Sequence, residues 1–114
     1  MIEAVLKEHN AVGIENALTI TELCILTGKT IREITKAVED ERKSGVLICS
    51  RMEGKGGYFM PANDVEIQSQ LASFERRIKS QSITLRVFRR YMKERAQYGE
   101  GEKAISAVAK LPKR

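Results

Sequence analysis

The spacing of hydrophobic residues over the first 45 positions predicts three short helices. Apolar residues at helical spacing place an amphipathic helix at the N-terminus, ending before Gly13. A second helix is expected over about residues 21–27 and a third over about residues 31–44, with a tight turn at Gly28 between them. Gly45 follows the third helix, where a left-handed cap costs least. The pattern therefore predicts two helices set at an angle, preceded by a third.

Threonines mark where two of these helices begin. Thr30 is followed three residues later by Glu33, and this T-x-x-E spacing is that of a capping box. Thr19 and Thr21 compete for the start of the preceding helix, and Thr19 is preferred because Glu22 gives it the same spacing. Ile20 is a candidate for a short strand before that helix.

After Gly45 the pattern changes from helical to extended. Two apolar, β-branched and aromatic runs flank a glycine-rich centre at residues 53–57, and Pro61 ends the second run. This arrangement predicts a β-hairpin. A helix-turn-helix followed by a hairpin predicts an α+β winged helix-turn-helix fold over residues 1–62, whose last helix lies in the major groove of DNA.

A long helix is predicted over residues 63–98, where no Gly or Pro occurs. At 1.5 Å per residue it would span ~50 Å, more than the width of a small domain. One part is therefore expected to pack on the core through Ile67, Leu71 and Phe74. The distal part, with Leu85, Phe88 and Met92, is expected to join two copies as a homodimer. Residues 99–114 are expected to form a flexible tail. The apolar residues recur in steps of three and four, interrupted by Gln81, as in a heptad pattern: Ile67, Leu71, Phe74, Ile78, Leu85, Phe88 and Met92.

Positive charge is concentrated in the second half of the chain. The net charge is +5 overall, with −1 over residues 1–62 and +6 over residues 63–114. Residues 76–95 alone carry a net charge of +7. This basic face is a candidate for contacts with DNA phosphates, or equally for the solvated side of a coiled coil. A basic amphipathic helix can also bind an anionic membrane surface, but the long heptad pattern and the attached winged domain argue against that partner. Its members are Arg76, Arg77, Lys79, Arg86, Arg89, Arg90, Lys93 and Arg95.

The chain resembles a known class of proteins over about residues 15–95. The architecture resembles the winged-helix DNA-binding domains of bacteria and their phages, such as the N-terminal domain of the biotin repressor. A closer resemblance is to small phage- or prophage-encoded helix-turn-helix proteins with the pattern ELxxLTG…REIxKAVExxRxxGVxICS…GGYF and a long basic helix. The matching residues are Glu22, Leu23, Leu26 to Gly28, Arg32 to Ile34, Lys36 to Glu39, Arg42, Gly45, Val46, Ile48 to Ser50 and Gly56 to Phe59.

The resemblance implies which residues face DNA. Arg32 would read guanine through a bidentate pair, and Lys36 would hold a phosphate. The acidic run at residues 39–41 departs from the pattern, and Glu41 stands where an apolar residue is more usual. The implied DNA-facing residues are Lys29, Thr30, Ile31, Arg32, Thr35 and Lys36, with Arg51 and Lys55 on the hairpin.

Other classes of function have little support in the sequence. No apolar run reaches the ~18 residues of a membrane span, no secretory signal is visible, and the two cysteines are expected to be reduced in a cytoplasmic protein. Gly28-Lys29-Thr30 is not a phosphate-binding loop, because Leu23 stands where that loop needs its first glycine. We find no catalytic set around His9, the only histidine, and no metal-ligand cluster, so no enzyme, cofactor or small-molecule substrate is expected.

The function expected from the sequence is therefore non-enzymatic binding of double-stranded DNA by a phage or prophage regulatory or replication-related factor. The alternative is a protein-interaction module, in which the winged domain binds a protein and the long helix joins copies.

Overall fold

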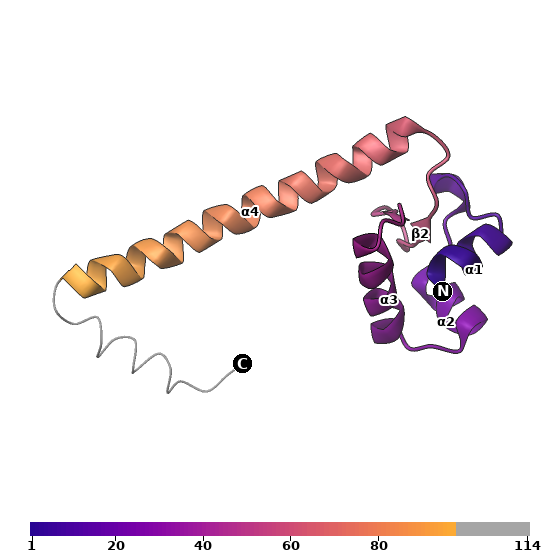
Figure 1. Cartoon of the computed structure of the whole chain (residues 1–114), viewed down its shortest axis with the longest axis horizontal. Helices are drawn as coiled ribbons and strands as arrows, with labels where there is room; N and C mark the ends of the chain where they lie inside the picture. Colours follow the sequence, from indigo (N-terminus) through magenta and orange to yellow (C-terminus); the bar gives the residue numbers. More distant parts are fainter. Residues whose placement is uncertain (98–114) are drawn as a thin grey trace. The chain divides into compact units, whose positions relative to one another are not determined.

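The computed structural model describes residues 1–97, and the predicted tail at residues 99–114 lies outside the described residues. Over the described residues the fold is α+β, as predicted, with four α-helices and a two-stranded antiparallel sheet (Figure 1). The chain divides into two compact units, and the boundary lies between Ser73 and Phe74. The elements are α1 (Ile2–Glu8), the 3-10 turn η1 (Ile14–Asn16), α2 (Ile20–Thr27), α3 (Ile31–Lys43), β1 (Cys49–Ser50), β2 (Tyr58–Phe59) and α4 (Asp64–Gln97).

Both predicted capping boxes are present. The hydroxyl of Thr19 accepts a hydrogen bond from the Glu22 amide at 3.1 Å, and that of Thr30 accepts one from the Glu33 amide at 3.2 Å. Each glutamate in turn accepts from the backbone amide of its threonine. Gly28 has the left-handed conformation expected for the turn, with φ of 70°. The short connection from α2 to α3 is thus closed by local hydrogen bonds on both sides.

The predicted hairpin is confirmed, and β2 is its better-paired strand. Cys49 pairs with Phe59 and Ser50 with Tyr58. On the other edge of β2, Leu18 and Tyr58 exchange two backbone hydrogen bonds of 2.9 Å. The strand predicted at Ile20 is wrong, because Ile20 is already in the first turn of α2 and the bridging residue is Leu18, directly before the Thr19 cap.

A glycine is required where β2 begins. Gly57 has φ of 124°, a region that side chains rarely adopt. A Cβ atom there would lie 2.5 Å from the backbone oxygen of Leu18. The hairpin can therefore approach the segment before α2 this closely only because residue 57 is a glycine, which has no side chain.

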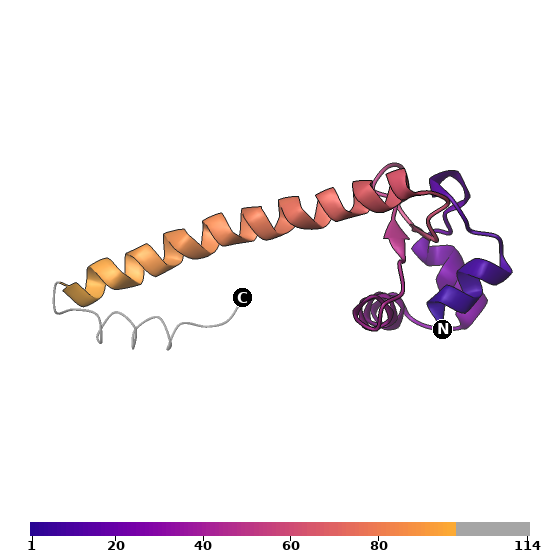
Figure 2. The same ribbon diagram turned by 45° about the horizontal axis from the view of Figure 1, so that its top comes forward.

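The buried core lies between α1, α2 and α3. Figure 2 looks almost along the axis of α3, with α1 and α2 beside it. The hairpin and the segment after α3 cover the rest, since Val46, Tyr58 and Met60 pack against the buried cluster. That cluster consists of Ile2, Leu6, Ala11, Leu23, Ile34, Val38 and Ile48.

The prediction that Ile67, Leu71 and Phe74 close this core is wrong. None of the three belongs to the buried cluster, and Leu71 is 55% exposed. Ile48 belongs to the cluster instead, and Val46, Tyr58 and Met60 pack against it. The first turns of α4 instead contribute polar contacts within the first unit: the Glu66 carboxylate accepts from the amides of Ile14 and Ala62, each at 2.8 Å, and the Gln70 side chain accepts from the Ser50 amide at 2.7 Å.

The contacts of Glu41 explain why an acidic residue stands in α3 where the pattern leads one to expect an apolar residue. Its carboxylate accepts hydrogen bonds from the backbone amides of Ile2 at 2.8 Å and Glu3 at 2.9 Å, and it lies 3.5 Å from the Met1 amine. These are donors that the start of a helix leaves unsatisfied. Burial raises the pKa of Glu41, but the hydrogen bonds and the amine outweigh it and lower the pKa below 4.5 overall. Glu41 thus joins α3 to α1.

Candidate nucleic-acid interface

The three basic residues predicted at the start of α3 share one surface feature. Lys29, Arg32 and Lys36 line an open depression of about 580 Å³ in the first unit. Their side chains are exposed, and the acidic residues Glu33 and Asp40 also line the depression. Met1 and Ala37 complete its lining. The structure therefore brings together the residues for which the sequence predicted base and phosphate contacts, and adds acidic neighbours to them.

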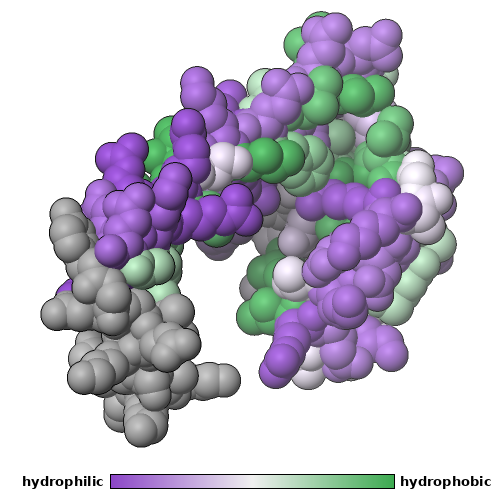
Figure 3. All heavy atoms as spheres, turned by 60° about the vertical axis from the view of Figure 1, so that its left-hand side comes forward, coloured by the Kyte–Doolittle hydropathy of each residue, from purple (hydrophilic) through white to green (hydrophobic). Residues whose placement is uncertain are grey.

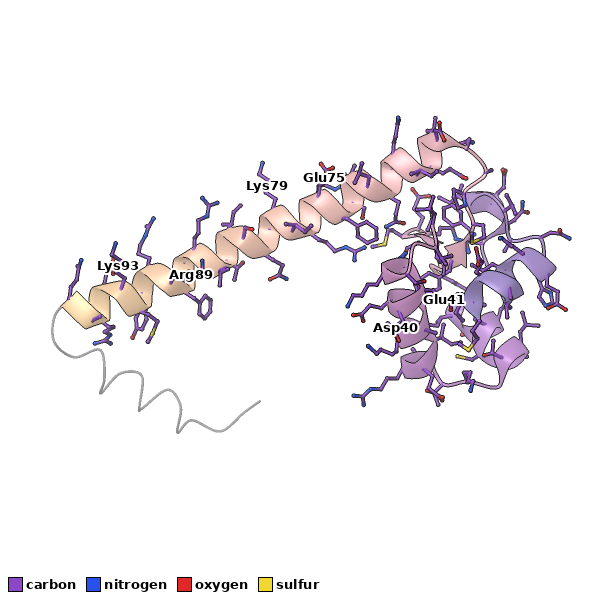
Figure 4. All side chains as sticks on the ribbon, viewed as in Figure 1. Asp40, Glu41, Glu75, Lys79, Arg89 and Lys93 are labelled. Atoms are coloured by element: carbon purple, nitrogen blue, oxygen red, sulfur yellow. The ribbon has the colours of Figure 1, made fainter. Side chains whose placement is uncertain are left out.

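Asp40 modifies the charge of this surface. Its carboxylate lies 3.2 Å from the Lys36 ammonium, one helical turn away on α3. Figure 4 labels Asp40 on this helix next to Glu41. An exposed pair of this kind contributes little to stability, and either member is free to take another partner. The four-residue spacing of Lys36 and Asp40 in the sequence is the signal that predicts this pairing.

The hydroxyl groups in the predicted site are engaged locally. The Thr30 hydroxyl serves the capping box, and the Thr35 hydroxyl donates to the Ile31 carbonyl at 2.9 Å. The hydrogen bonds from the backbone and side chain of Thr30 lower the pKa of Glu33, so this carboxylate stays charged at neutral pH. Ile31 leaves its apolar side chain exposed beside these groups.

The two hairpin residues predicted to touch DNA differ in their surroundings. Arg51 is half-buried and donates through Nε to the Gly56 carbonyl at 3.0 Å. Its guanidinium therefore supports the loop that carries Lys55. Lys55 is exposed at that loop, between two glycines with positive φ.

The basic residues of α4 are all exposed from Arg76 to Lys93, and several form one stripe. Lys79, Arg86 and Lys93 recur every seven residues, so they fall on the same side of the helix. Lys79 and Lys93 project from the same side of the ribbon in Figure 4. Arg77 differs, because its guanidinium lies 5.5 Å from the centre of the Phe74 ring.

No known protein family, curated protein or solved structure matches the chain. None of the helices in residues 1–97 is both long and apolar enough to cross a membrane. Within the same residues, no group of three His, Cys, Asp or Glu side chains is placed to hold a metal ion.

Proposed function

We propose that this chain is a non-enzymatic double-stranded DNA-binding protein of the winged helix-turn-helix type, with α3 as its recognition helix. The observation that carries the proposal is the exposure of Arg32 and Lys36 on the first two turns of α3, in one open depression with Lys29. A helix can enter the major groove only if this part is uncovered. The buried residues Ile34 and Val38 lie on the opposite side and hold the helix to the core.

The residue types along α3 suit two different kinds of contact with DNA, one to bases and one to phosphates. Arg32 offers the planar group that pairs with two guanine atoms, and so would supply sequence preference. Lys36 offers a point charge that suits a phosphate. Lys55 on the hairpin loop would contact the backbone or the minor groove, and the exposed methyl groups of Ile31 suit the methyl group of thymine.

The stripe of Lys79, Arg86 and Lys93 on α4 adds positive potential. Exposed cations at regular spacing suit phosphates, which are also regularly spaced, and each neutralised phosphate steepens the dependence of binding on salt. By its resemblance to phage and prophage proteins, the chain would act in regulation or replication of a phage genome.

The test is selection of bound fragments from random duplex DNA, repeated with two variants of α3. Arg32→Ala should relax the sequence preference and cost about 1–3 kcal/mol on the selected site. Lys36→Ala should weaken all duplexes alike and reduce the slope of log affinity against log salt by about 1. Lys7→Ala on α1 is the matched control, since it removes one exposed charge outside the depression.

The alternative is that the first unit binds a protein. The observation that favours it is the mixed charge of the depression, where Glu33 and Asp40 lie beside the three basic residues. If the chain binds no duplex at low ionic strength, or binds with no dependence on salt, the DNA proposal fails and this alternative replaces it.

A further inference from the structure

The second unit has an apolar stripe along one side of α4 in which several large side chains are exposed. Ile78 is 66% exposed, Leu85 49% and Phe88 68%. Figure 3 shows hydrophobic (green) residues on the surface of α4 between hydrophilic (purple) ones. The stripe follows steps of three and four residues, the spacing with which one helix packs along another. We define this seam as Phe74, Ile78, Gln81, Leu85, Phe88 and Met92.

We propose that the seam is the contact with a second copy of this chain, and that the two helices pair parallel and in register. The proposal does not rest on DNA binding, because it concerns residues 74–92 of α4 alone. Two features of the seam argue for a second copy in this orientation: its single polar residue, and the distribution of charge beside it.

Gln81 favours the parallel, in-register arrangement. In that arrangement each seam residue meets its own counterpart, so the amide of Gln81 meets an identical amide that can both donate and accept. In an antiparallel pair, residues at the heptad position of Gln81 meet residues at the other core position instead. Those are Leu71, Ile78, Leu85 and Met92, all apolar. An antiparallel pair would thus bury each Gln81 amide against a hydrocarbon side chain, which costs free energy.

The charges beside the seam permit pairing of like copies despite the basic character of α4. In a parallel pair, each flanking residue faces one five positions later on the partner. Arg77 would face Ser82, and Thr84 would face Arg89, so no two cations meet at these positions. The stripe of Lys79, Arg86 and Lys93 lies away from the seam and would stay in solvent.

The first test is a disulfide at one end of the seam. Met92→Cys is made in a Cys24→Ala background, because Cys24 is a half-buried free thiol. In a parallel pair the two new cysteines face each other within bonding reach. In an antiparallel pair centred on the seam, Met92 lies opposite Phe74, which places the two cysteines about 27 Å apart along the axis. We expect mild oxidation to give a covalent dimer as the main product.

The matched control is Val87→Cys in the same background, since Val87 is 61% exposed on α4 but outside the seam. It should give little covalent dimer. If Met92→Cys gives no more dimer than Val87→Cys, the parallel arrangement is overturned.

The second test is sedimentation of the full chain without nucleic acid, over a range of concentrations. The wild type should sediment as a concentration-dependent dimer. Leu85→Asp with Phe88→Asp should raise the dissociation constant about a hundredfold or more, because two apolar side chains that the dimer buries become charged. Ile83→Asp with Val87→Asp makes the same change at two exposed positions outside the seam and should leave it within about threefold.

A wild type that stays monomeric throughout overturns the proposal, and so does a control pair that dissociates the dimer as strongly as the seam pair. Circular dichroism checks that each variant keeps its helix. If the seam pair loses helix, the disulfide yield decides. A failure of DNA binding with an intact dimer would overturn only the function proposed above.

Discussion

Glu41, on α3, accepts hydrogen bonds from the first backbone amides of α1. Its side chain is 17% exposed, and its carboxylate accepts hydrogen bonds from two backbone amides of α1. Because these donors would otherwise lie partly buried without a partner, the carboxylate stabilises the contact between α1 and α3. It acts at a distance of 39 residues along the chain.

Glu41→Gln should lower the free energy of unfolding by about 1–3 kcal/mol at neutral pH, since an amide has one acceptor oxygen in place of two. Urea denaturation measures the loss. Glu8→Gln, which changes an exposed carboxylate of α1, is the control and should shift stability by less than about 0.5 kcal/mol.

The loss should depend on pH in a defined direction. The pKa of Glu41 is lowered in the folded state, so its charged form stabilises the fold above its unfolded value near 4.5, and this contribution disappears as the pH falls through the folded value. The difference between wild type and Glu41→Gln should therefore be constant above about pH 5 and shrink on acidification. A difference that grows on acidification would contradict this role.

The capping box at Thr30 gives a second residue-scale prediction. Thr30→Ala should cost about 1 kcal/mol, because the Glu33 amide loses its acceptor, while Thr30→Ser should retain most of the stability. Thr35→Ala is the matched control, since its hydroxyl bonds back to the Ile31 carbonyl within the same helix, an arrangement that helices do not need. Urea midpoints that fall equally for Thr30→Ala and Thr35→Ala would show that the cap adds nothing.

At the scale of single residues, a hydrogen bond could be predicted from the sequence when its two partners lie close together along the chain. The caps at Thr19 and Thr30 were predictable because each partner lies three residues away. The function of Glu41 was not, because its partners are the backbone amides of Ile2 and Glu3, which carry no sequence signal. The exposure of Arg32 and Lys36 followed from helical periodicity, whereas their grouping with Met1 in one depression needed the fold.

At the scale of the element, α3 combines opposite charges on its exposed face. Lys36 lies 3.2 Å from Asp40, so the carboxylate would compete with a phosphate for the same ammonium group. Asp40→Asn should therefore tighten binding to every duplex by about threefold to tenfold at low salt and steepen the salt dependence. Glu8→Gln, which removes one negative charge from α1, should change affinity much less. Fluorescence anisotropy with labelled duplexes measures both, and weaker binding by Asp40→Asn would count against a phosphate contact at Lys36.

The long helix shows where pattern alone reaches its limit. Apolar spacing correctly predicted a continuous helix after residue 63, but not what its apolar residues touch. Leu71 was expected in the core and is exposed, whereas Ile48 lies in the core and Val46, Tyr58 and Met60 pack against it. A heptad pattern predicts that one face of the helix packs against another element, but it does not identify that element. The contacts through Glu66 and Gln70 escaped prediction because both side chains bind backbone amides far away along the chain, those of Ile14 and Ser50.

At the scale of the whole molecule, the division after Ser73 predicts that the first unit folds alone. A fragment of residues 1–73 retains the entire buried cluster and the hydrogen bonds of Glu66 and Gln70. It should unfold in one cooperative urea transition, with a free energy within about 1 kcal/mol of that of the same unit in the full chain. A fragment of residues 1–62 should be less stable by about 1–3 kcal/mol, because the amides of Ile14 and Ser50 lose their acceptors. Equal stability of the two fragments would show that the first turns of α4 are dispensable.

The stripe of Lys79, Arg86 and Lys93 and the seam lie on different sides of α4, and salt acts on the two in opposite directions. Added electrolyte competes for the sites that polyanions would occupy on Lys79, Arg86 and Lys93. The same electrolyte reduces repulsion between two such helices, and sulfate in particular promotes burial of groups such as Phe88. The salt concentration would therefore decide which of two processes dominates. Dilute buffer favours binding of separate molecules to a polyanion, and concentrated sulfate favours association of the chain with itself.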